Sequence, residues 1–263
     1  MAERTNHERS KGIFYHLAIV ALALIVCLTV NAINVIQAQE KASQGPSPKE
    51  LAATQWTLKY RFGKDLKVGD WVTYQITQEG VKTGELELKV TEQENGGVWI
   101  VEKFGGGNEL HFLVDLKEMR LLKAFQAAGT GMRQAPPLLD EKQVAEIIQQ
   151  MKKEEAEKRA VILEWRKGTN TEKVDVPAGS FTCTYLEPEY SEEVTKQMSP
   201  AQIAELKSKS RLYFSEDVPR LLPFQIAMGW WYYIEASEEV KGGLVECKHM
   251  MGVELTAYSG QEK

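Results

Sequence analysis

Alternation between apolar and polar residues constrains the fold of this chain more than any other feature. Four segments place apolar side chains at every second position: Trp56, Leu58, Tyr60 and Phe62; Val72, Tyr74 and Ile76; Leu86, Leu88 and Val90; Leu110, Phe112 and Val114. This is the period of a β-strand that buries one face. Asn95-Gly96 follows the third segment and is a strong hairpin signal. Strands joined by tight turns predict an antiparallel meander.

Two segments depart from this period and predict helices. The first lies near residues 138–159, where four apolar residues are spaced i, i+3, i+4 and i+7 on one helical face. These residues are Val144, Ile147, Ile148 and Met151. The second is expected near 191–207, where Ser199 can cap a helix and Pro200 can occupy its first turn.

The combination of strands and helices predicts an α+β fold. We expect a curved antiparallel β-sheet, similar to a half-barrel, with one or two helices packed on it. An N-terminal hydrophobic export helix precedes this domain in the prediction.

The N-terminal region has the pattern of an export signal. Residues 12–30 contain no side chain charged at neutral pH other than a protonatable His16, and Ala32 and Ala38 loosely fit a cleavage site. The run is also about long enough to span a bilayer. Residues 1–38 are therefore predicted to be either a removed signal peptide or a retained membrane anchor.

The rest of the chain is predicted to be a linker and one domain. Residues 39–54 are polar and contain glycine and proline, which is typical of a linker. Residues 55–263 are expected to form a single β-rich domain. In both interpretations of the N-terminus this domain is exported, periplasmic or extracellular, and residues 12–30 hold it at the membrane if they are not cleaved.

The charge of the chain excludes one class of partner. The formal net charge is -5, and the basic residues are not concentrated in any segment. Nucleic-acid binding depends on a basic surface, so we exclude a nucleic-acid partner.

The residues that carry chemistry are few, and they predict a protein that is not an enzyme. Outside the export segment only His111 and His249 remain, and neither accompanies a nucleophile motif such as G-x-S-x-G. No phosphate-binding loop is present, because the GGGN stretch at 105–108 lacks the following lysine. We therefore expect no catalytic residue and no cofactor.

Two cysteines, Cys183 and Cys247, remain in the exported part. An even pair in an oxidising compartment predicts a disulfide, and two buried thiols are the alternative. Together with His249 the pair offers three metal ligands, but no fourth ligand is evident, so we expect no metal site.

The stretch DVPAGSFTCTY at 175–185 predicts a hairpin. Pro177, Ala178 and Gly179 suit a type I turn followed by a glycine bulge, which is a three-residue loop. With VGDWVTYQI at 68–76, FSEDVPRLLPF at 214–224 and GVELTAYSG at 252–260, this stretch resembles exported bacterial β-rich proteins of unknown function that share a V-x-V-P-A-G-[TS]-F hairpin. That group is distantly similar to the lipoprotein-carrier half-barrels. The resemblance implies a curved sheet that wraps acyl chains, and it implies no catalytic residue.

These observations lead to two hypotheses on function. The first is a non-enzymatic envelope protein that binds a lipid or another apolar ligand in the curved sheet. Its predicted ligand-binding residues are Trp230, Tyr232, Val144, Ile147, Ile148 and Met151. The alternative is a membrane-tethered structural or protein-interaction module without a ligand cavity, in which the aromatic run at 230–233 belongs to the core or is covered.

Overall fold

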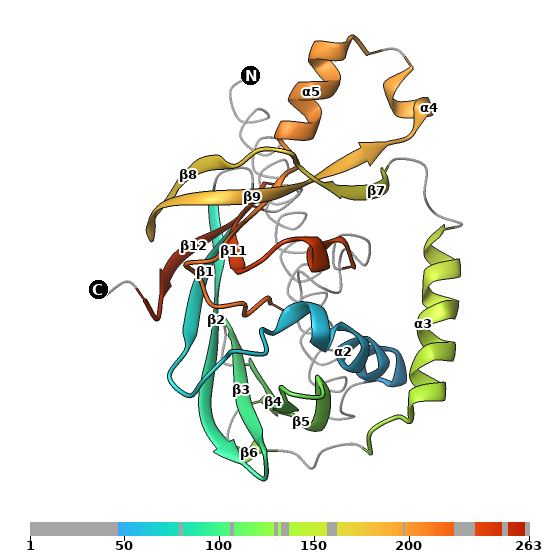
Figure 1. Cartoon of the computed structure of the whole chain (residues 1–263). Helices are drawn as coiled ribbons and strands as arrows, with labels where there is room; N and C mark the ends of the chain where they lie inside the picture. The colour runs from blue at the N-terminus through green and yellow to red at the C-terminus, as the bar shows by residue number, and fades with distance from the viewer. Residues whose placement is uncertain are drawn as a thin grey trace, which may run out of the picture. The chain divides into compact units, whose positions relative to one another are not determined.

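The computed structural model describes residues 47–78, 81–105, 108–128, 131–132, 137–156, 162–196, 198–223, 235–248 and 252–260 (Figure 1). The chain divides into two compact units, Met1–Gly45 and Pro46–Lys263, and every described residue belongs to the second unit. The predicted export segment therefore lies outside the described residues. Within the described ranges, no helix is both long and apolar enough to cross a membrane.

The described strands form one antiparallel sheet with the order β6-β5-β4-β3-β2-β1-β12-β11-β10-β9-β7, and β8 also pairs with β9. The strands are β1 (Trp71–Gln78), β2 (Val81–Glu94), β3 (Gly97–Phe104), β4 (Asn108–Asp115), β5 (Arg120–Ala128), β6 (Gly131–Met132), β7 (Ile162–Lys167), β8 (Glu172–Val176), β9 (Gly179–Tyr190), β10 (Leu212–Ser215), β11 (Gly243–Cys247) and β12 (Gly252–Tyr258). The helical segments are α2 (Pro48–Arg61), α3 (Glu141–Ala156), α4 (Glu192–Thr195), α5 (Pro200–Ser208) and the short η1 (Ser237–Glu239). An antiparallel sheet with a few helices confirms the predicted α+β class.

The first and last strands join the two halves of the sheet. β1 pairs with β2 on one side and with β12 on the other, where Tyr74 lies opposite Leu255. The Asn95-Gly96 turn between β2 and β3 is confirmed, because both residues have a positive φ, 47° and 82°. These angles are those of the tight hairpin turns that match the twist of a two-stranded ribbon.

The segment that precedes β1 is a helix, and both predictions for this region are wrong. The linker prediction for 39–54 is wrong from Pro48 onward, and the strand predicted from Trp56 is wrong as well, because α2 begins at Pro48 and ends at Arg61. Residues 39–46 of the predicted linker lie outside the described residues. A capping box begins α2: Ser47 Oγ accepts from Glu50 N, and Ser47 N donates to Glu50 Oε2 at 2.7 Å. This local signal outweighs the period-two alternation.

Helix α2 covers one face of the sheet, and α3 packs on α2 (Figure 1). From α2, Leu51 and Leu58 belong to the same core as the buried residues of β1 to β4. From α3, Ile148 packs with Ala52 and Ala53 of α2. The helix predicted near 138–159 therefore exists, but it contacts another helix rather than lying directly on the sheet.

The hairpin between β8 and β9 is tighter than the sequence predicts. Val176 pairs with Gly179, so the loop contains only Pro177 and Ala178. Gly179 has a φ of 132°, which a residue with a side chain rarely adopts. The amide of Ala178 donates to Leu255 O at 3.2 Å, which fixes the hairpin tip against β12.

Cys183 and Cys247 do not form the predicted disulfide, and both are buried thiols. Strand β10 lies between β9 and β11, which puts the two cysteines roughly 10 Å apart across the sheet. That exceeds the ~7 Å between Cα atoms that a disulfide tolerates. They also face opposite sides: Cys247 lies opposite Leu212, whereas Cys183 shares the face of Tyr185 and Tyr213.

The first prediction concerns the oxidation state of these cysteines. After denaturation without a reductant, iodoacetamide is expected to label the tryptic peptides of both Cys183 and Cys247, because neither sulfur is bonded to another. Before denaturation both should remain unlabelled, since both residues are 0% exposed. Mass spectrometry of the peptides provides the measurement. A pair that is labelled only after reduction would contradict the structure.

A second prediction follows from the pKa of Cys183. Burial raises this pKa from 9.0 to about 12, and the nearby Glu246 adds to the shift. The thiol in the unfolded chain loses its proton first, so the free energy of unfolding should fall as the pH rises from 9 to 12, by at most ~1.4 kcal/mol per pH unit. Urea unfolding measures this slope. The Cys183→Ala variant is the control, and an unchanged slope in that variant would refute the assignment.

Candidate functional site

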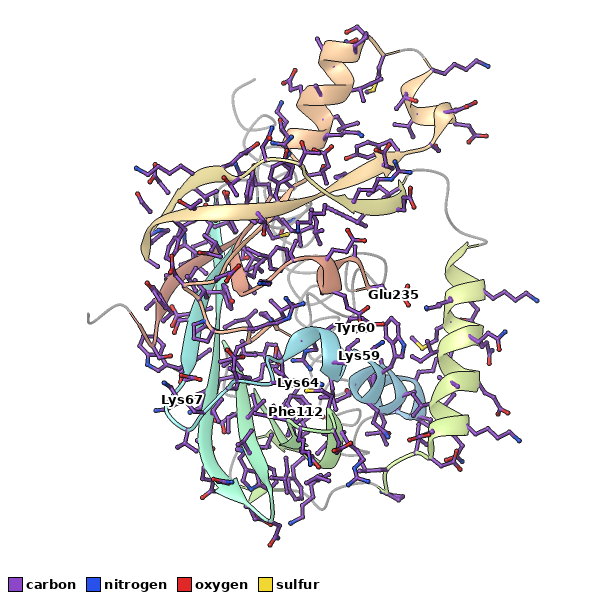
Figure 2. The ribbon with its side chains drawn as sticks, in the orientation of Figure 1. Lys59, Tyr60, Lys64, Lys67, Phe112 and Glu235 are labelled. Carbon is purple, nitrogen blue, oxygen red and sulfur yellow. The ribbon has the colours of Figure 1, made fainter. Side chains whose placement is uncertain are left out.

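A cleft of about 1130 Å³ opens where the end of α2 meets the loops that flank β10 and β11. Residues within 59–70 form one wall, from the last turn of α2 to the start of β1. Residues within 216–220 and 237–242 form the other wall, and 258–260 complete the lining. Figure 2 shows Lys59, Lys64 and Lys67 along the first wall.

The cleft is lined by as many acidic residues as basic ones. The basic residues are Lys59, Lys64, Lys67, Arg220 and Lys241. The acidic residues are Asp65, Asp70, Glu216, Asp217 and Glu238. Burying so many charges under an acyl chain without partners is costly, so the lining favours a ligand with charges of its own.

The side chain of Arg220 lines the cleft and connects α2 to the loop at 237–242 through hydrogen bonds. Its Nε donates to Tyr60 O at 2.9 Å, and its Nη1 donates to Val240 O and Gly242 O at 3.0 and 3.3 Å. Its Nη2 donates to the carbonyl and hydroxyl oxygens of Ser237 at 2.8 and 2.9 Å. Burial lowers the pKa of Arg220 to about 10. All five donors are used, so Arg220 contributes charge to the cleft rather than new hydrogen bonds.

Behind this cleft, a fully buried ion pair joins α2 to the sheet. Arg61 Nη2 lies 2.6 Å from Glu102 Oε2, and neither side chain is exposed to solvent. The guanidinium also donates from Nε to Leu222 O at 2.9 Å. It lies 4.7 Å from the ring centre of Phe62 and 5.3 Å from that of Phe112. Figure 2 shows Phe112 near the end of α2.

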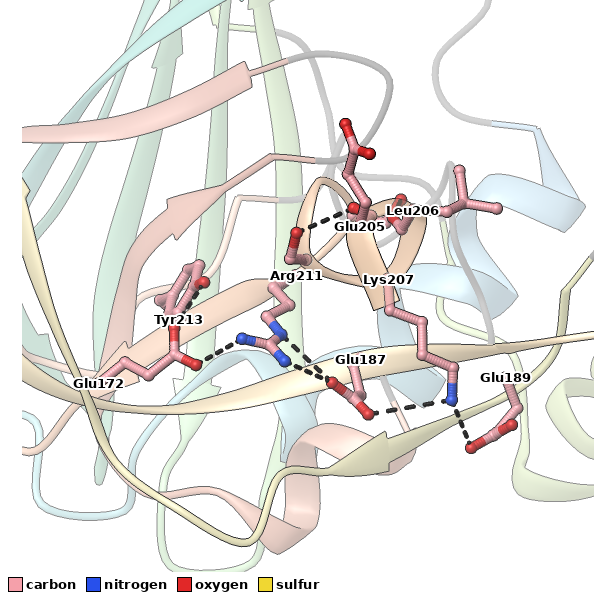
Figure 3. A network of polar contacts seen from close by, with 10 residues as sticks. Glu172, Glu187, Glu189, Glu205, Leu206, Lys207, Arg211 and Tyr213 are labelled. Atoms are coloured by element: carbon pink, nitrogen blue, oxygen red, sulfur yellow. Dashed lines mark hydrogen bonds and ion pairs between the residues drawn. The ribbon is translucent and has the colours of Figure 1, made fainter. Parts of the chain in front are cut away.

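A second polar network lies where α5 meets strands β8 and β9 (Figure 3). Arg211 forms ion pairs with Glu172 of β8 and with Glu187 of β9, the latter at 2.9 Å from Nη2. Lys207 of α5 pairs with Glu189 at 2.9 Å and with Glu187 at 3.9 Å. Lys207 therefore attaches α5 to β9, and Arg211, which follows α5, connects β9 to β8.

Tyr213 of β10 belongs to the same network. Its hydroxyl donates to Glu172 at 3.0 Å, and burial raises its pKa to about 12. The hydroxyl therefore stays protonated at neutral pH and acts as a hydrogen-bond donor.

The predicted ligand-binding residues do not meet at one described site. Four of them, Val144, Ile147, Ile148 and Met151, pack with Ala52 and Ala53 of α2. Trp230 and Tyr232 lie outside the described residues. The role of these six residues in binding a ligand stays a prediction.

His111 lies on β4, opposite Val101 and Phe125. One imidazole nitrogen is 2.9 Å from Glu109 Oε2, and Glu109 also pairs with Lys103 at 3.1 Å. The bond to Lys103 is the main cause that lowers the pKa of Glu109. His249 lies outside the described residues.

Sequence reasoning missed the three arginines that organise these sites. Arg61 lies in a stretch without a motif. Arg220 lies within FSEDVPRLLPF at 214–224, but that stretch assigns it no role, and the partners of both arginines are distant in sequence. For Arg61 a signal existed, because the Ser47-Pro48-Lys49-Glu50 capping box predicts the helix that buries it. For Arg211 no local signal exists, because its partners lie on β8 and β9.

No family model and no curated protein matches this chain. Among solved structures, the chain is similar to a Bacteroides fragilis protein that is described as exported and as having a YmcC-like fold. The two share 10% identity with a TM-score of 0.25, over 75% of this chain and 98% of that one. This similarity is too distant to identify a function.

A third prediction concerns the buried pair. The Arg61→Met variant should lose about 3–5 kcal/mol of unfolding free energy, because Glu102 would remain buried without its partner. The double variant Arg61→Met/Glu102→Leu should recover much of this loss, since both charges of this pair are then removed. Urea denaturation measures all three proteins. A single variant as stable as the parent would show that the pair is not closed in solution.

Proposed function

We propose that this protein is an exported, non-catalytic component of the cell envelope that acts as a protein-interaction module. The observation that carries this proposal is the helical arm, which we define as residues 191–209, containing α4 and α5. In Figure 1 the arm lies beyond β9, away from α2 and α3.

The arm is much longer than the connection it makes requires. β9 and β10 are neighbouring antiparallel strands, with Leu186 opposite Leu212. Such strands are usually joined by two to five residues. Here the chain leaves β9 at Tyr190, forms two helices and returns at Leu212.

The arm is held firmly but adds little to the core. Neither α4 nor α5 contains a buried residue. At its base, the hydroxyl groups of Tyr190 and Ser210 are hydrogen bonded at 2.8 Å in a buried position. Lys207 and Arg211 add the ion pairs of Figure 3. An exposed element that adds no buried residue to the core and is attached to the sheet by ion pairs is suited to contact another macromolecule.

The apolar residues of the arm are incompletely covered. Val194, Ile203 and Leu206 are half-buried, and Met198 is 36% exposed. A partner surface that covers them would gain about 25 cal/mol for each Å² of apolar area removed from water.

Export is supported by the sequence of residues 12–30, which has the length and composition of a signal or an anchor. The absence of catalysis is supported by the sequence as well, since only two histidines follow the export segment and neither accompanies a nucleophile motif.

The alternative, a lipid bound in the curved sheet, is less well supported. Helix α2 and the buried pair of Arg61 and Glu102 occupy the covered face of the sheet.

The arm can be tested by photocrosslinking in intact cells. A photoreactive amino acid at Ala204, which is exposed on α5, should form a crosslink with one protein partner. The same residue at Lys117, which is exposed in the turn between β4 and β5, is the matched control. Equal crosslinking at both positions, or none at Ala204, would refute the proposal.

A shortened arm provides the fourth prediction. Replacement of residues 192–209 by Asn-Gly should change the free energy of unfolding by less than about 1 kcal/mol, because α4 and α5 contain no buried residue and the carboxylates that Lys207 leaves behind are partly exposed to water. Urea unfolding of the two proteins measures this difference. A loss of several kcal/mol would show that the arm is part of the core and not a projecting element.

A further inference from the structure

We infer that the cleft beside α2 binds a peptide segment that carries both acidic and basic side chains, provided by another protein. This inference is independent of the arm, because the cleft and the arm share no described residue.

The volume of the cleft is slightly above the range that is common for small-ligand pockets. Pockets for small ligands commonly measure about 300–1,000 Å³. The volume here is about 1130 Å³, and its lining comes from four separate stretches of the chain. A lining of this extent suits an elongated ligand that touches several loops.

The charges on the two walls select the ligand further. Both walls carry charges of both signs. The wall from 59 to 70 combines three lysines with Asp65 and Asp70, and the opposite loops combine Glu216, Asp217 and Glu238 with Arg220 and Lys241. Repulsion by the acidic residues disfavours a simple anion, and repulsion by the lysines disfavours a simple cation. A segment with charges of both signs can pair with both walls.

Part of this charge is available to a ligand. Among the described residues, Lys64 and Lys67 have no carboxylate within ion-pair distance of their Nζ atoms. Lys59 Nζ is 3.4 Å from Glu238 Oε1, and both side chains are about half-exposed. This exposed pair is weak, so a ligand can replace either partner at little cost.

The floor between the charged walls is apolar, apart from Arg220. Phe62, Leu66 and Val218 line it and are at most 8% exposed. Half-buried Tyr258 adds an aromatic ring at one end. Because Phe62, Leu66 and Val218 are almost fully buried, the apolar contact available to a peptide is mainly the ring of Tyr258, while its charged side chains reach the walls. The positive charge of Arg220 favours a carboxylate of the peptide nearby, even though its donors are already used.

The test is a selection of random dodecapeptides displayed on phage, with the full-length protein in a mild detergent as the target. We expect enrichment of peptides that combine Asp or Glu with Lys or Arg around apolar residues. A synthetic peptide of the enriched sequence is then measured by fluorescence anisotropy. Its affinity should fall at least about tenfold in the Lys64→Glu/Lys67→Glu variant, since two attractive pairs become repulsive.

The matched control reverses two exposed lysines outside the cleft, in the Lys117→Glu/Lys173→Glu variant. This variant and the protein with the shortened arm should bind the peptide within about twofold of the parent, as expected for charges that make no contact. No enrichment over an unrelated target would overturn the inference. Enrichment of purely acidic peptides, or displacement of the peptide by millimolar inorganic phosphate, would identify an anion site and overturn it as well.

Discussion

The structure depends on the buried ion pair between Arg61 and Glu102. This pair joins the end of α2 to β3, and the rings of Phe62 and Phe112 pack against the guanidinium and help to exclude water from the pair. An isolated charge at this depth would be strongly unfavourable, so each partner requires the other to be in place. The position of α2 is therefore specified more narrowly than apolar contacts alone would require. The first wall of the cleft begins in the last turn of α2, so the position of α2 also determines the position of this wall.

The sequence predicts best the features that are determined locally. Asn95-Gly96 forms its hairpin turn because these two residues adopt a positive φ readily, and Ser199 with Pro200 begins α5 because each satisfies the needs of a helix start. The Trp56–Phe62 alternation was misleading, because a helix that buries residues on most of its surface can also show period two. The pairing of Cys183 and Cys247 depends on β10 lying between their strands, which is a property of strand order and not of spacing. The ion pairs of Arg61, Arg211 and the cleft are equally non-local.

The surface of the protein supports an interaction role more directly than its interior does. The covered face of the sheet is occupied by α2, and the apolar face of α3 packs on α2. By contrast, the arm is fixed by a network of charges yet buries no residue, and the cleft exposes charges of both signs. The arm and the cleft order polar side chains, which costs conformational entropy, and neither feature extends the core. A protein partner on the arm and a peptide segment in the cleft would each cover side chains that the chain itself leaves exposed.

The central claim is that α2 packs on the covered face of the sheet, so that partners bind at surface features and not inside the sheet. Native mass spectrometry of residues 39–263, purified without detergent, tests this claim most directly. The structure predicts that the measured mass equals the mass of the polypeptide alone. Arg61 and Glu102 are fully buried and are not accessible to a ligand. A stoichiometric lipid that stays bound under these conditions would contradict the account, because the account places no apolar ligand against the sheet.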